Sequence, residues 1–250
     1  MSEGAGSERE RGRHGTLHEV HTQAGMLDAI EWPRRLRARV VEPGHGPHEP
    51  RLHGYAAESD LARHYSHSQI AYLALTGELP ADDIARAFDV ALAYLAPVGV
   101  HEAATHAASL ARLGQAPPRA VLEVAMVGLA ERAHAAIESL SEFLAWLDGG
   151  EGSPPESATT TDASHARSVD RLRDALPPTF AVPALAHPLR RTAAVAAVLH
   201  ACDLRRPEQL EAVWTLASIV STFAEAMATK PLAFREYPMD TPGFRYHEAE

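Results

Sequence analysis

The sequence predicts an all-α protein, and three observations support this fold class. Alanine is abundant, and it loses less entropy in a helix than other residues do. Runs of β-branched residues are rare. Several segments carry apolar residues at helical spacing, with start and stop residues at their ends. With 250 residues, 46% of them hydrophobic, the chain can form one large or two small domains around a sizeable core.

The first strong helix signal begins at Ser66. Ser66 and Gln69 have the spacing of a capping box, in which each side chain satisfies a backbone N–H at the start of a helix. The apolar run Ile70–Leu75 follows, and Gly77 is a typical stop residue. Pro80 then opens a second helix, because a missing N–H costs nothing in the first turn.

Later segments predict further helices. The apolar spacing and the Gly and Pro residues indicate helices over about Glu102–Leu113, Pro118–Leu147 with a break near Ala130–Ala136, His165–Leu176, Pro188–Cys202, and from Pro207 onward.

The chain divides into four predicted parts. Residues 1–50 are an N-terminal tail, and two short strands are predicted around Arg37–Val41 and Arg51–Tyr55 with a turn between them. Residues 51–147 and 186–250 are the first and last parts of one helical core, and the last part ends in an aromatic and Pro-containing tail. Residues 148–185 hold a linker at 149–164, rich in Gly, Ser, Thr and Pro, and one short helix.

Charge and composition exclude several classes of protein. The net charge of -10 disfavours nucleic-acid binding, which needs a basic face. No apolar run reaches the roughly 18 residues that a membrane span needs. The start of the chain is polar, without the apolar segment of a signal peptide, so a cytoplasmic protein is expected.

No metal site is predicted. His101 and His106 are five residues apart, which is off the i,i+4 spacing that would place both on one helix face, and no second cluster supports them. Cys202 is the only cysteine and lies on an apolar helix, so it is expected to be a buried structural thiol.

One segment, from His53 to Pro80, carries a family resemblance. Bacterial citrate synthases read roughly R-G-Y, then a D-L-A element, then an A-Y-L-L-L helix that ends in G-E-L-P. The same pieces occur here in the same order, at Gly54–Tyr55, Asp60–Ala62, Ala71–Leu75 and Gly77–Pro80. The chain therefore resembles the citrate synthase and citryl-CoA lyase family as a shortened, divergent member. The resemblance implies a large helical domain with the small CoA-covering domain largely deleted.

Two further landmarks of the family suggest site residues. His101–Glu102 resembles its His-Glu element, one residue off in spacing, which implies that His101 binds a substrate carboxylate or carbonyl. From Pro118 onward the register places His134 at the family's catalytic His, which polarises the thioester carbonyl during enolisation. Ala135 and Ala136 replace two glycines there, which favours continuous helix and could close the site. For both His101 and His134, an ordinary structural histidine is the alternative.

The resemblance breaks after His134 and returns at the C-terminus. No Asp or Glu occurs from Ala175 to Cys202, where the family carries the Asp that abstracts the α-proton. The closing segment, Lys230–Tyr246, resembles that of the citryl-CoA lyase module of ATP-citrate lyase, and this implies that Arg235 binds substrate.

Three functional hypotheses follow from the resemblance. The chain could take part in acyl-CoA and oxo-acid carbon–carbon bond chemistry, as a homodimer or with a full-length homologue that supplies the base. It could be a pseudoenzyme that senses a carboxylate or binds a protein. It could also be an independent enzyme that uses Glu102, His101, His106 and His134. In each active case coenzyme A enters as a thioester substrate, not as a bound cofactor. An unrelated helical bundle is the remaining alternative.

Overall fold

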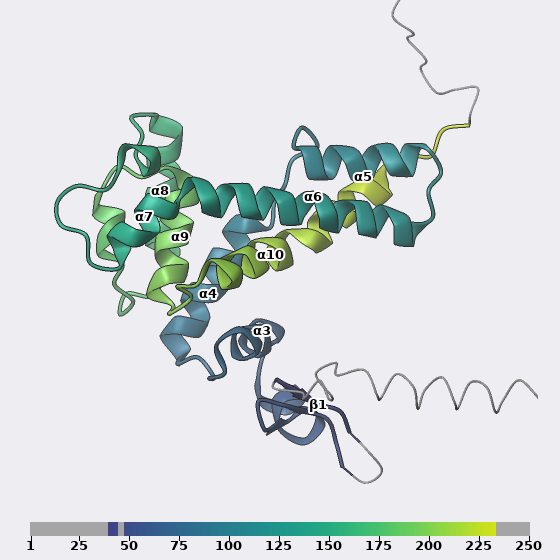
Figure 1. The fold of residues 1–250 in the computed structure, drawn as a ribbon, viewed down its shortest axis with the longest axis horizontal. Coiled ribbons are helices and arrows are strands. Elements are labelled where there is room, and N and C mark those ends of the chain that lie inside the picture. Colours follow the sequence, from purple (N-terminus) through teal and green to yellow (C-terminus); the bar gives the residue numbers. More distant parts are fainter. Residues whose placement is uncertain (1–39, 45–47, 234–250) are drawn as a thin grey trace, which may run out of the picture.

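The computed structural model describes residues 40–44 and 48–233, and it confirms the all-α fold class. The principal helices are α3 (His67–Thr76), α4 (Asp82–Leu95), α5 (Ala103–Leu113), α6 (Pro118–Ser139), α7 (Ser141–Leu147), α8 (Ala163–Ala175), α9 (Arg191–Ala201) and α10 (Pro207–Ala228). Helices α5, α6 and α10 lie side by side at one end of the molecule, and α7, α8 and α9 are grouped at the other (Figure 1). Within the described residues, no helix is long and apolar enough to cross a membrane.

The start of α3 matches its sequence signals. The Ser66 hydroxyl accepts from the Gln69 backbone N–H, and the Gln69 side chain accepts from the Ser66 N–H, which completes the capping box. Gly77 ends the helix in the left-handed conformation, with φ of 85°. The next helix, α4, begins at Asp82, two residues after Pro80.

The N-terminal strands differ from the prediction. The described residues form three antiparallel strands in the order β1 (Val41–Glu42), β2 (Arg51–Leu52) and β3 (Tyr55–Ala56), and residues 37–39 of the predicted first strand lie outside them. The predicted second strand, Arg51–Tyr55, is interrupted because His53 and Gly54 form a two-residue turn with φ of 47° and 85°. Positive φ at both central residues is what the tight hairpin turn requires, and Gly adopts it without steric cost. A π-helical segment (Ala57–Leu61) and α2 (Ala62–His64) connect this sheet to α3.

The predicted break in α6 near Ala130–Ala136 is wrong. The helix continues through this segment to Ser139, because Ala, Glu and Arg are good helix formers. The break lies at Leu140, where φ of -102° and ψ of 6° leave the helical region and α7 begins. His134 therefore sits within an uninterrupted helix, not at a turn.

The segment 149–164 is tied to the core and is not a free linker. It contains a 3-10 turn, η2 (Glu156–Ala158), whose Ala158 is fully buried. The backbone N–H groups of Thr160 and Arg190 donate to Pro188 and Ala158 carbonyls at 2.9 and 2.8 Å. The composition of this segment predicted a linker because it contains no large apolar residue. Backbone hydrogen bonds and one small buried side chain hold it to the core instead.

The main hydrophobic core is centred on α9. All residues from Ala193 to His200 are buried, so this helix is enclosed on every side, chiefly by α4, α7, α8 and the 3-10 turn Pro183–Ala186. Cys202 ends it with a fully buried thiol, and burial raises the pKa of that thiol to about 12. The Tyr72 hydroxyl on α3 donates to the Cys202 carbonyl at 2.9 Å, which joins α3 to the core.

Helices α5 and α6 approach closely at Gly128. A Cβ at this position would lie 2.8 Å from the Cα and 3.0 Å from the Cβ of the buried Ala104 on α5. Because a backbone atom would have to move, we expect Gly128→Ala to lower the free energy of unfolding by about 1 kcal/mol. The cost of overpacking is expected to be larger than the gain in helix propensity from Gly to Ala. Urea unfolding measures this change.

Gly114→Ala is the matched control for that substitution. A Cβ on Gly114 would make only ordinary contacts, at 3.5 Å or more, and φ there is -73°. The control should be close to neutral. Equal stability of the two variants would contradict the close approach of α5 and α6.

Candidate functional site

His134 projects from the outer face of α6 and meets a carboxylate from α10. Its Nδ1 atom lies 2.9 Å from Oε1 of Glu211, and the two residues are 77 positions apart in the sequence. The imidazole is 64% exposed and the carboxylate 35% exposed. The hydrogen bond to Glu211 raises the pKa of His134, and the charges of Glu211, Glu138 and Glu131 act in the same direction.

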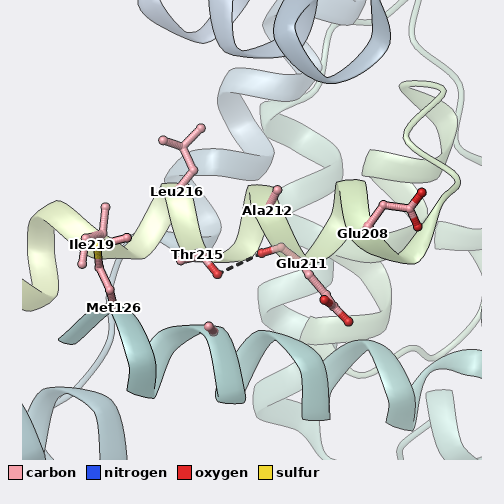
Figure 2. Close-up of a pocket in the computed structure, with 8 residues that line it drawn as sticks. Met126, Glu208, Glu211, Ala212, Thr215, Leu216 and Ile219 are labelled. Carbon is pink, nitrogen blue, oxygen red and sulfur yellow. Dashed lines mark hydrogen bonds between the residues drawn. The ribbon is translucent and has the colours of Figure 1, made fainter. Parts of the chain in front are cut away.

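A shallow groove of about 430 Å³ lies between α6 and α10 beside this pair. Figure 2 shows the residues that form it. They are Met126 and Ala130 of α6, and Glu208, Glu211, Ala212, Thr215, Leu216 and Ile219 of α10. The Thr215 hydroxyl donates to the Glu211 backbone carbonyl at 3.0 Å, so it is used within the helix (Figure 2). The groove is thus mainly apolar, with two carboxylates toward the start of α10.

His101 does not contact His134 in the described part of the chain. It lies exposed in the turn before α5, with its ring against Gly99. The next residue, Glu102, caps α5 through its backbone position, and its carboxylate forms an ion pair with Arg132 on α6. This ion pair joins the start of α5 to α6 at Arg132, two residues before His134. The residue at the start of α5 that makes the contact is Glu102, not His101.

The remaining predicted site residues are not gathered around His134. His106 is exposed on α5, and the Glu102 carboxylate is already held by Arg132. Arg235 lies outside the described residues. Within the described ranges, no three His, Cys, Asp or Glu residues are arranged to hold a metal ion. No local pattern in the sequence indicates Glu211, because only the packing of α10 on α6 brings it to His134.

Comparison with known proteins finds similarity at the level of structure and none at the level of sequence families. No protein-family model and no curated protein matches the sequence. The chain is similar to citryl-CoA lyase from Hydrogenobacter thermophilus, with a TM-score of 0.59 and 17% identity over 87% of this chain and 98% of that chain. It is also similar to ATP citrate lyase from Methanothrix soehngenii in complex with citrate and coenzyme A, with a TM-score of 0.55 and 10% identity. A third similar structure is a mutant Methanosaeta concilii ATP citrate lyase in complex with (3S)-citryl-CoA, with a TM-score of 0.56 and 11% identity.

These likenesses define the class of fold. The protein has a citrate-synthase-like, helical fold of the kind found in citryl-CoA lyase, as the sequence resemblance predicted. It spans nearly the whole length of the citryl-CoA lyase chain but only 47% of each ATP citrate lyase chain. At these identities the likeness concerns the fold and does not extend to activity.

Proposed function

We propose that this protein acts in acyl-CoA and oxo-acid carbon–carbon bond chemistry of the citryl-CoA lyase type, as a dimer or with a homologous subunit. One observation carries the proposal. On a fold like that of citryl-CoA lyase, an exposed imidazole, His134, stands beside a groove at the position that the sequence resemblance assigns to the catalytic histidine. The similar structure that this chain covers to 98% is a citryl-CoA lyase, and this favours the cleavage direction.

The chemistry needs a hydrogen-bond donor where negative charge develops. Cleavage of citryl-CoA, or its formation, passes through an enolate of the acyl group, and a fixed donor at that oxygen lowers the barrier. An imidazole with a raised pKa can supply this donor. Coenzyme A would bind as part of the substrate. Two of the similar structures hold citrate and coenzyme A, or citryl-CoA.

The charges around His134 support a site that is completed from elsewhere. Glu131, Glu138 and Glu211 all raise the pKa of His134, and Glu208 also lines the groove. Citrate and oxaloacetate are anions, so they need cations here, and the nearby Arg132 is already paired with Glu102. Arg235 of the C-terminal segment, or a residue of a second subunit, would supply the missing positive charge.

The outer face of α6 and α10 supports association with a second subunit. It exposes a group of large apolar side chains that comprises Leu122, Met126, Val127, Leu216 and Val220, which we call the α6–α10 face. Large apolar side chains left exposed on two helices that pack together are typical of protein interfaces. We propose that a second copy or a homologous chain covers it. A cytoplasmic location remains a prediction.

Calorimetric titration with oxaloacetate, citrate and acetyl-CoA tests this function, together with an assay for oxaloacetate formed from citryl-CoA. We expect carboxylate binding by the wild-type chain, and we expect His134→Ala to weaken it by at least 10-fold, because each lost hydrogen bond to a charged group contributes about 1.5–3 kcal/mol. His106→Ala, which alters an exposed histidine of α5, is the control and should bind normally. Equal binding by the His134 variant and the wild type would rule out the assigned role.

The second candidate function is that of a pseudoenzyme that binds a protein or senses a carboxylate. Ala135 and Ala136 continue α6 where the family has glycines, so the backbone cannot approach a substrate closely there. The sequence also has no acid from Ala175 to Cys202 to serve as the base. Carboxylate binding without any conversion of citryl-CoA, even with a homologous subunit present, would favour this function.

A further inference from the structure

The hydrogen bond between His134 and Glu211 joins two long helices, α6 and α10, which also pack against each other along their length. The neighbours of each residue are firmly held, since Ala133 and Ile137 on α6 and Leu210 and Val213 on α10 are all buried. Two side chains on such rigid elements keep their relative positions better than two loop residues would. The 2.9 Å contact at Nδ1 therefore fixes the orientation of the imidazole ring.

A carboxylate can only accept a hydrogen bond, so this contact also fixes the protonation of the ring. Nδ1 must carry the proton that Glu211 accepts, and in the neutral ring Nε2 is then the unprotonated nitrogen. The described residues place no hydrogen-bond partner on Nε2. We propose that Glu211, which lines the groove between α6 and α10, is a positioning residue that holds His134 in the Nδ1–H tautomer and leaves Nε2 to meet a ligand.

This inference rests on the proposed function for its chemical meaning. When the ring takes up a second proton, Nε2–H can donate to a developing oxyanion. When that proton is lost, Nε2 is again a hydrogen-bond acceptor. The groups that face His134 are Glu211 from α10 and Glu131 and Glu138 from its own helix, and all three raise its pKa. Glu211 differs from the other two because it also makes the hydrogen bond.

Nuclear magnetic resonance of the ¹⁵N-labelled full chain tests the inference through His134 itself. His134→Gln assigns the signals by their disappearance. In the wild type we expect the Nδ1–H tautomer above the pKa. In Glu211→Leu, which keeps the bulk and removes the acceptor, we expect the Nε2–H tautomer to gain population and the pKa of His134 to fall. Glu208→Leu is the matched control, because Glu208 lines the same groove one turn away and is not bonded to His134.

Three outcomes separate this inference from the proposed function. A fall in pKa and a change of tautomer in Glu211→Leu alone, together with a matching shift in the pH profile of citrate binding, would support the positioning role. An unchanged tautomer and pKa in Glu211→Leu would overturn it and leave the proposed function standing. In the third outcome, Glu211→Leu changes the tautomer and the pKa as expected, but the wild type binds neither citrate nor coenzyme A. This result would overturn the proposed function, and the positioning role with it.

Discussion

Replacing Trp214 by Ala is expected to lower the free energy of unfolding by about 3–5 kcal/mol, because it removes a large aromatic side chain from the core. Trp214 is the largest fully buried side chain among the described residues, at 1% exposure. It lies on α10 and packs in the cluster that surrounds α9. Urea or thermal unfolding of the purified variant measures the loss.

A graded series makes this expectation specific. Trp214→Phe leaves a smaller cavity and should lose less stability than Trp214→Ala. Leu204→Ala, another fully buried position in the same cluster, should also be costly. A loss below about 1 kcal/mol for Trp214→Ala would contradict its central place in the core, since surface substitutions typically stay within about 0.5 kcal/mol.

Placing a charge at Val220 is expected to weaken self-association strongly. Val220 is 75% exposed, the most exposed large apolar side chain among those described, and it lies on the α6–α10 face. In a twofold dimer Val220→Glu would introduce two carboxylates into an apolar contact. Burying unpaired charge costs several kcal/mol, so we expect the dimer to weaken by at least about 100-fold. Analytical ultracentrifugation at micromolar concentration measures the change.

Val41→Glu is the matched control for the interface. It makes the same substitution at another exposed valine, 53% exposed on β1 and remote from the α6–α10 face. This variant should sediment like the wild type. A wild-type chain that sediments as a monomer would contradict the homodimer, and mixing with a homologous subunit would then test the heterodimer.

The parts of the fold that the sequence predicts are those determined by neighbouring residues. The capping box of Ser66 and Gln69, the stop at Gly77 and the proline start of α6 each depend on a few adjacent positions, and the structure confirms them. The position of the break in the α6–α7 region was missed, because Leu140 leaves the helix where it becomes buried in the tertiary core. Hydrophobic spacing carries no information about that packing.

The site was less predictable for the same physical reason. The family resemblance predicts His134, but its partner Glu211 lies on another helix, 77 residues later in the sequence. The pairing of Glu102 with Arg132 likewise depends on how α5 packs on α6. Such contacts depend on helix packing angles, and no local pattern specifies those. Whether His134, His101 and Arg235 act on substrate stays a prediction.

The burial of Cys202 has a practical consequence for measuring activity. Cleavage of citryl-CoA to acetyl-CoA is silent to thiol reagents, whereas hydrolysis of the citryl-CoA thioester, the step that completes citrate synthesis, liberates the free thiol of coenzyme A. Disulfide reagents react with thiolates, and the only sulfhydryl of this chain is fully buried with a pKa of about 12. The folded protein should therefore contribute almost no background colour. A slow rise in colour without substrate would instead report unfolding of the core around α9.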